Sequence, residues 1–241
     1  MEHTVFFASP TRGSWLSSEY LAGALSTVLH IVAADDVKLV GWDATGSNIY
    51  VDNARNHLAH DFMTHPEKPE NFFFWDDDVG GPDIPMKVLQ FLRRPEDIVI
   101  GCPPQKRDPT PEKPQQEFPI RLRLDGDNNL IQQRGLLSFH IGPTGFMRIK
   151  RRVFERLAEV TETYKDIRHD GSEVDIHYFF RAGPVNGWWT GEDVYFLKTW
   201  LDLGGTAWVD PNITMTHRGE KVWVGRYGDL FTQEASLPEK V

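Results

Sequence analysis

The feature that most constrains this chain is an apolar run over residues 72–75, with the sequence FFFW, that ends directly in three aspartates. An apolar run without alternation is typical of a strand buried on both faces, as in a parallel sheet covered by helices. Such sheets bind their ligands outside the carboxyl ends of the strands. The three carboxylates, Asp76, Asp77 and Asp78, therefore fall where a ligand is expected.

Three adjacent carboxylates repel one another unless a cation neutralises them, and hard oxygen ligands suit Mg²⁺ or Mn²⁺. In an extended segment Asp76 and Asp78 lie on the same side and Asp77 faces away. We therefore expect Asp76 and Asp78 to approach a metal. A solvated acidic turn is the alternative, and the buried strand before the acids, with the glycine-containing turn after them, favours the metal site.

Short apolar runs alternate with helix-length segments through the first hundred residues. Strands are expected at 5–8, 38–41, 72–75 and 97–101, and helices at 18–32, 49–63 and 85–93. This order predicts an α/β fold with a mainly parallel central sheet flanked by helices.

The rest of the chain is less regular. Residues 102–119 contain six prolines among polar residues, which predicts a mobile loop without regular structure. Beyond it we expect strands at 120–124, 130–133, 136–141 and 206–209, and helices at 151–163 and 192–203. This part predicts a smaller mixed sheet.

Composition disfavours several classes of partner. Acidic residues outnumber basic ones, 35 to 26, so the net charge of −9 repels nucleic acid. The basic cluster Arg148, Lys150, Arg151 and Arg152 is interpreted as a solvated face at a helix start. No apolar run is long enough to span a membrane and no signal segment is recognised, so we expect a cytoplasmic protein. The single cysteine, Cys102, is expected to be a buried structural thiol.

A second acidic pair follows Gly191. Glu192 and Asp193 precede an amphipathic pattern and fall in the first turn of the predicted helix, where they complement the helix dipole. A carboxylate held there also has the chemistry to deprotonate a hydroxyl that attacks a sugar. Asp193 is the candidate base, and Glu192 is the substitute.

Two further segments carry possible ligand contacts. Gly142 and Gly145 lie three residues apart and allow a backbone to approach a ligand closely, with a strand-to-helix turn as the alternative that this spacing alone favours. His217 follows the last predicted strand and is a candidate ligand for the same metal, with an ordinary surface histidine as the alternative.

Taken in order, these four elements resemble the GT-A fold glycosyltransferases. That family has a D-x-D after a buried strand, a glycine-containing loop, an x-E-D at a helix start and a metal-binding histidine near the C-terminus. Here the matching segments are 72–79, 142–146, 191–193 and His217. Each motif is short, but their joint occurrence from about residue 5 to residue 219 is much more specific than any one of them.

The resemblance extends to small stand-alone glycosyltransferases of bacteria, phages and large DNA viruses. It implies that the end of the first strand, Ser9, Pro10, Thr11 and Arg12, holds the nucleotide base and ribose, and that Arg55 faces the donor pyrophosphate. An exposed structural ion pair is the alternative for Arg55. Donor contacts are also expected from Asp76, Asp77 and Gly145.

Two adjacent tryptophans stand directly before the second acidic pair. Trp188 and Trp189 are candidates for stacking against sugar faces of an acceptor, with a place in the core as the alternative. We expect the proline-rich loop and the segment after Gly219 to become ordered when donor binds.

The resemblance implies a metal-dependent glycosyltransferase. It moves a sugar from a nucleoside-diphosphate donor, with UDP-sugar favoured, to an acceptor hydroxyl on a glycan, and inversion at the anomeric carbon is favoured. The cofactor is Mn²⁺ or Mg²⁺, bound by Asp76, Asp78 and His217. Two alternatives remain open: transfer to hydroxymethylated bases of viral DNA, and an inactive carbohydrate- or nucleotide-binding module. A nucleotidyltransferase is disfavoured because that class normally has a glycine-rich loop and a basic residue after the first strand. Residues 9–13 contain only one glycine.

The expected organisation is one domain over residues 1–219 with a C-terminal tail at 220–241. Within it, residues 1–102 form a nucleotide-binding half and residues 120–219 an acceptor half.

Overall fold

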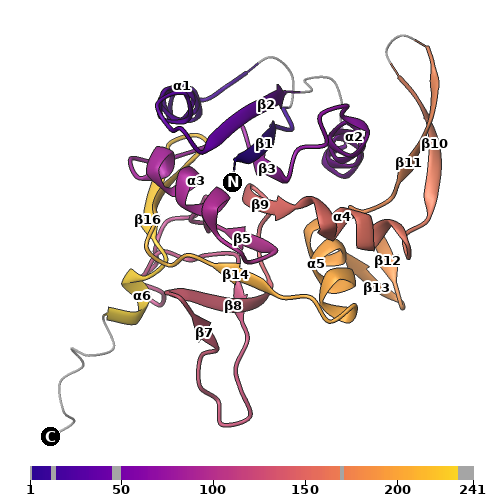
Figure 1. Cartoon of the computed structure of the whole chain (residues 1–241). Coiled ribbons are helices and arrows are strands. Elements are labelled where there is room, and N and C mark those ends of the chain that lie inside the picture. Colours follow the sequence, from indigo (N-terminus) through magenta and orange to yellow (C-terminus); the bar gives the residue numbers. More distant parts are fainter. Residues whose placement is uncertain (1, 12–14, 45–49, 169–170, 233–241) are drawn as a thin grey trace, which may run out of the picture.

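A nine-stranded mixed sheet forms the centre of the molecule in the computed structural model, which describes residues 2–11, 15–44, 50–168 and 171–232 (Figure 1). The strands are β2 (Val37–Asp43), β1 (His3–Ala8), β3 (Asn71–Trp75), β9 (Phe146–Lys150), β5 (Ile98–Ile100), β14 (Ala207–Val209), β8 (Leu136–Ile141) and β6 (Arg121–Leu122), in that order across the sheet, with β7 (Gln132–Gln133) also paired to β8. The prediction of an α/β fold is confirmed.

The sheet is parallel in two blocks. β2, β1 and β3 run parallel to one another, and so do β5 and β14. Strand β9 lies between the two blocks and is antiparallel to both β3 and β5. The sequence did not predict β9, because its residues were interpreted as the approach to a helix. Strand β8, expected in a separate smaller sheet, instead joins the main sheet beside β14.

Arg148 explains how β9 is held at the centre. Its side chain is fully buried, and its guanidinium donates hydrogen bonds to the carbonyl oxygens of Phe91, Arg94, Glu96 and Asp97. Burial lowers the pKa of Arg148 to about 9. A buried cation satisfied by carbonyls fixes the position of the strand, since an unpaired charge there costs several kcal/mol.

Two other members of the basic cluster, Lys150 and Arg151, are also used internally. Lys150, 6% exposed, pairs with Glu70 at 2.5 Å. Arg151 donates to the carbonyl oxygens of Phe62 and Pro69, each at 2.8 Å. The interpretation of this cluster as a solvated face is therefore wrong for these residues, and they form no free basic surface.

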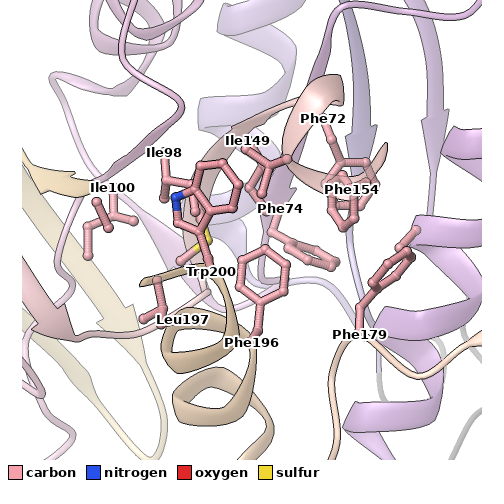
Figure 2. Close-up of a cluster of buried hydrophobic side chains, with 14 of the residues drawn as sticks. Phe72, Phe74, Ile98, Ile100, Ile149, Phe154, Phe179, Phe196, Leu197 and Trp200 are labelled. Carbon is pink, nitrogen blue, oxygen red and sulfur yellow. The ribbon is translucent and has the colours of Figure 1, made fainter. Parts of the chain in front are cut away.

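Helices cover both faces of the sheet. On one face lie α1 (Ser18–Val32) and α3 (Ile84–Arg93), and on the other lie α2 (Val51–Thr64), α4 (Arg151–Ala158) and α5 (Glu192–Asp202), as Figure 1 shows. Figure 2 shows the core beneath the second group, where Phe72 and Phe74 of β3 pack near Phe154 and Phe196. Because β3 is apolar on both sides, each helical layer has a hydrophobic surface to cover.

Smaller antiparallel pairs surround the main sheet. They are β10 (Thr163–Ile167) with β11 (Glu173–His177), β12 (Gly183–Val185) with β13 (Trp188–Thr190), and a three-stranded sheet of β4 (Val79–Gly80), β15 (Thr214–Arg218) and β16 (Val222–Arg226). The helix expected to reach residue 163 ends at Ala158, since β10 begins at Thr163.

The segment after Gly219 differs from the expected tail. Strand β16 pairs with β15, the short helix α6 (Asp229–Thr232) follows, and Tyr227 is only 8% exposed. This segment therefore belongs to the packed structure as far as residue 232.

No helix in the described part of the chain is both long and apolar enough to cross a bilayer.

Candidate active site

The acidic run turns sharply as it leaves the sheet. All five residues of β3 are buried, and the strand ends at Trp75. The amide of Val79 then donates to the carbonyl oxygen of Asp76 at 3.1 Å, which closes a turn over residues 76–79. The expectation of an extended segment with Asp76 and Asp78 on one side is therefore wrong. The turn instead directs the two carboxylates to different partners.

Asp76 lies against the glycine loop. Strand β9 pairs with β3 so that Phe146 stands opposite Trp75, which places residue 145 beside the end of β3. The amide of Asp76 donates to the carbonyl oxygen of Gly145 at 2.9 Å. A Cβ added at Gly145 would lie 2.9 Å from the Asp76 carboxylate, so a larger residue would displace it.

Arg55 connects the two acidic motifs. Its Nη2 lies 3.2 Å from Asp76, and its Nε lies 3.5 Å from Glu192. The guanidinium also stands over the Phe74 ring at 5.1 Å. The side chain is 5% exposed, so the alternative of an exposed ion pair is wrong. Buried Nε and Nη1 have no hydrogen-bond partner among the described residues, which leaves donor capacity at this position.

The second acidic pair begins α5, as expected. Burial raises the pKa of Glu192, the charge of Arg55 opposes that shift, and the neighbouring Asp193 adds to it. The Asp193 carboxylate accepts a hydrogen bond from the amide of Val194 at 2.7 Å. Both acids are partly exposed, so they remain accessible to a ligand.

Asp78 occupies the opposite end of the turn. Strand β15 pairs with β4 and sets His217 beside Val79, so that His217 Nε2 lies 3.5 Å from the Asp78 carboxylate. Nδ1 of the same ring is 2.7 Å from the carbonyl oxygen of Pro104. Lys106 pairs with the other oxygen of Asp78.

The electrostatics of Asp78 reflect these neighbours. Burial raises its pKa, but hydrogen bonds with His217 and Lys106 outweigh burial and hold the pKa below its ordinary value. Lys106 belongs to the proline-rich segment, which has no helix or named strand, as its prolines predicted. Sequence reasoning missed Lys106, because nothing local marks a lysine that meets an acid 28 positions away.

The fit to a divalent cation rests on this end of the turn. A carboxylate suits Mn²⁺ or Mg²⁺, an imidazole nitrogen is a ligand of divalent transition metals, and the ammonium of Lys106 shows that the position attracts a cation. Asp76 is directed to Arg55 instead. Across the described ranges no three His, Cys, Asp or Glu side chains are gathered as metal ligands. The residues thus provide two adjacent ligands and not a finished triad.

The end of β1 is mostly enclosed. Ser9 is fully buried, and its hydroxyl is 2.6 Å from the hydroxyl of Tyr20 and 3.2 Å from Trp42 Nε1. Thr11 is also buried, while Pro10 is partly exposed. Arg12 lies outside the described residues.

Asp77 ties the acidic turn to α1. Its carbonyl oxygen accepts a hydrogen bond from the amide of Ser17, the N-cap residue of that helix, at 3.0 Å. The turn is therefore held between α1 on one side and the glycine loop on the other.

The adjacent tryptophans are on the surface. Trp188 and Trp189 are 80% and 78% exposed on β13, which directly precedes α5. The alternative that they belong to the core is excluded. Two exposed aromatic rings near the second acidic pair provide flat surfaces of the kind that sugars stack on.

The buried thiol is confirmed, since Cys102 is 2% exposed and burial raises its pKa.

No family model and no curated protein matches the chain. Among solved structures, the crystal structure of A197 from STIV matches this chain with a TM-score of 0.50 and 18% identical residues. The match spans 90% of this chain and 86% of the A197 chain. A 4-diphosphocytidyl-2C-methyl-D-erythritolsynthase from Anaerococcus prevotii covers 83% of this chain and 99% of its own, with 11% identity. Its TM-score of 0.34 is too low to support an argument. The chain therefore shares an α/β fold with A197.

Proposed function

We propose that this protein is a glycosyltransferase that moves a sugar from a nucleoside-diphosphate donor, with UDP-sugar favoured, to an acceptor hydroxyl on a glycan. The observation that carries the proposal is the buried Arg55, whose guanidinium lies between Asp76 and Glu192. These acids belong to two motifs far apart in the sequence. Their meeting around one cation, beside the glycine loop, supports a single site.

Arg55 has the chemistry to meet the donor pyrophosphate. A guanidinium presents a planar set of donors that matches phosphate oxygens, and Nε and Nη1 of Arg55 have no hydrogen-bond partner in the part of the chain that the structure describes. We assign Ser9, Pro10, Thr11 and Arg12 to the side of the base and ribose. In this proposal residues 1–102 bind the nucleotide and residues 120–219 bind the acceptor.

Asp78 and His217 would hold Mn²⁺ or Mg²⁺, and Asp76 would become the third ligand once Arg55 pairs with the donor pyrophosphate instead. A bound divalent cation would neutralise negative charge that develops on the leaving nucleoside diphosphate. Lys106 would have to leave Asp78 for the cation to bind there. Asp77 and Gly145 would then line the donor side of the turn.

On the acceptor side we assign Asp193 as the base that takes the proton of the attacking hydroxyl, with Glu192 as the substitute. The raised pKa of Glu192 makes its carboxylate a better proton acceptor than an ordinary glutamate. Attack from the face opposite the leaving group inverts the anomeric carbon, which is the outcome we favour. Trp188 and Trp189 would stack against the acceptor sugar.

Calorimetric titration with a panel of nucleoside diphosphates, with and without Mn²⁺, tests the proposal. We expect one nucleotide to bind only with Mn²⁺ and this binding to weaken at least about tenfold in Asp78→Asn, which is about 1.4 kcal/mol. Asp202→Asn is the matched control, because Asp202 is an exposed acid paired with Lys198. Loss of binding is expected in the first variant only.

Absence of nucleotide binding, or binding that ignores both Mn²⁺ and Asp78, would overturn the proposal. If binding depends on metal but no sugar transfer or donor hydrolysis follows, the inactive binding module replaces the enzyme. Transfer to hydroxymethylated DNA in place of a glycan would identify the alternative acceptor. In that case the affinity of the protein for DNA would fall steeply as the salt concentration rises.

A further inference from the structure

The outer face of α1 is apolar and has no partner among the described residues. Tyr20, Ala24 and Ile31 of this helix are buried against the sheet. On the opposite face, large apolar side chains recur every three or four residues and continue into the segment before the helix. Their exposed fractions are 85% for Trp15, 44% for Leu16, 46% for Leu21, 60% for Leu25, 70% for Leu29 and 80% for Val32.

We call these six residues the α1 stripe. A helix at the edge of a globular protein normally turns a polar face to solvent. Scattered exposed leucines need no explanation, but a contiguous row along one helix marks an interaction site. Figure 1 shows α1 at the outside of the molecule, and no other described element buries the six side chains of the stripe.

The charges around the stripe decide between a membrane and a protein partner. Apart from the buried Tyr20, the ionisable residues within α1 are Glu19, which pairs with Arg218, and His30, whose ring bonds to the carbonyl oxygen of Ser26. Helices that lie in a membrane surface carry Lys or Arg on their polar face. This helix carries neither, and the net charge of −9 opposes an anionic lipid surface.

The same absence of charge suits a second copy of the chain. In a two-fold contact the same patch lies on both copies, and residue i of one copy meets residue j of the other. A stripe without charged residues therefore brings no charge into such a contact. Leu21, Leu25 and Leu29 form a ridge with a spacing of four residues. Two such ridges interdigitate when helices cross at about −50°.

The stripe supplies about half or more of the apolar area that such a contact buries. Full burial of one large aliphatic side chain removes roughly 60–120 Å² of apolar area from water. At their exposed fractions, the six side chains provide on the order of 250–450 Å² per protomer. A standard interface buries about 800 Å² per partner, of which rather more than half is apolar.

We propose that the protein is a homodimer in which the α1 stripes of two copies pack against each other across a two-fold axis. The N-terminal end of α1 also holds the acidic turn, through the hydrogen bond from Ser17 to Asp77 and the Glu19–Arg218 ion pair. The dimer contact therefore buttresses the helix that supports the candidate site.

Sedimentation velocity of the full chain, from low to high micromolar concentration, tests the proposal. We expect the wild-type protein to sediment at twice the 27.7 kDa mass of one chain. The double variant Leu25→Glu and Leu29→Glu places two carboxylates in the contact of each copy and should sediment as a monomer. Both side chains are largely exposed, so circular dichroism should show an unchanged fold.

The matched control is Val160→Glu with Ile167→Glu, at positions 54% and 68% exposed outside the stripe. It should remain a dimer. A wild-type monomer at every concentration, or a double stripe variant that stays dimeric, would overturn the proposal. Flotation of monomeric wild-type protein with phosphatidylcholine vesicles would also overturn it, because it would assign the stripe to a lipid surface.

Discussion

The two ends of the acidic turn are built differently, although Asp76 and Asp78 are only two residues apart. Asp76 meets Arg55, a cation that is 5% exposed and stands on a helix packed against the sheet. Asp78 meets Lys106, a cation that is 35% exposed and stands on the irregular proline-rich segment. One acid is held by a buried side chain of the core, and the other by an exposed side chain of a loop.

This difference separates a fixed partner from a displaceable one. A buried guanidinium cannot leave its acid without an unpaired charge remaining in the protein, which costs several kcal/mol. A partly exposed ammonium exchanges its acid for water at little cost. The turn therefore combines a rigid end at Asp76 with an end at Asp78 that is open to another cation.

Replacement of the fixed cation should have the largest effect. Arg55→Met keeps an apolar stem of similar length but leaves Asp76 and Glu192 without their shared cation. We expect the free energy of unfolding in urea to fall by about 3–5 kcal/mol. Arg152→Met is the control, because Arg152 is 63% exposed and its ion pair with Asp97 should contribute at most about 1 kcal/mol. Equal losses in the two variants would remove the distinction between a fixed and a displaceable cation.

The response to pH sharpens the comparison. The pKa of Glu192 is raised by burial, so its folded form takes up a proton before its unfolded form does as the pH falls. This residue therefore makes stability decrease as the pH rises through its folded pKa. Glu192→Gln should remove that decrease when urea denaturation is repeated from pH 4 to 7, an effect smaller than that of Arg55→Met.

The pKa of Asp78 is shifted the opposite way, and its contribution to stability is lost only in more acidic solution. An unchanged difference in stability between wild type and Glu192→Gln over the whole pH range would show that Glu192 titrates as an ordinary surface acid.

Replacement of the displaceable cation should have the smallest effect on stability. Lys106→Met is expected to change the free energy of unfolding by less than about 1 kcal/mol. The same change removes the competitor for Asp78, so the affinity for Mn²⁺ in a calorimetric titration should rise by up to about fivefold, the equivalent of about 1 kcal/mol. Lys113→Met, in the same segment and 67% exposed, should leave the affinity unchanged. A weaker Mn²⁺ affinity in Lys106→Met would make Lys106 part of the cation site.

Local patterns predicted the elements that depend on local sequence. The expected helix at residues 18–32 and the expected strand at 136–141 have the bounds of α1 and β8. The prolines of residues 102–119 predicted the lack of regular structure there. In each case propensity and periodicity agree with the tertiary packing, so a single window of sequence is sufficient.

The parts that were missed depend on distant partners. Strand β9 contains Arg148 and Lys150, and two charged residues in a short segment indicate an exposed position. The strand is nevertheless buried, because carbonyl oxygens and Glu70 satisfy these charges. The sequence predicted the order of the site motifs but not the contacts between them. The turn at residues 76–79 sends Asp76 and Asp78 to different cations, and neither Arg55 nor Lys106 is near them in sequence.

The position of β9 has a consequence for how the protein is made. A ribosome that has released residues 1–102 has already exposed β3 and β5, but the strand that pairs with both of them is not yet synthesised. Each strand keeps an edge with unpaired backbone N–H and C=O groups until residues 146–150 emerge. Such unpaired edges favour association with other chains. Nascent chains of this protein therefore pass through a period in which chaperone protection matters. Strand β9 closes the edges of β3 and β5 that face each other, and the period ends only when β14 pairs with β5 and β8.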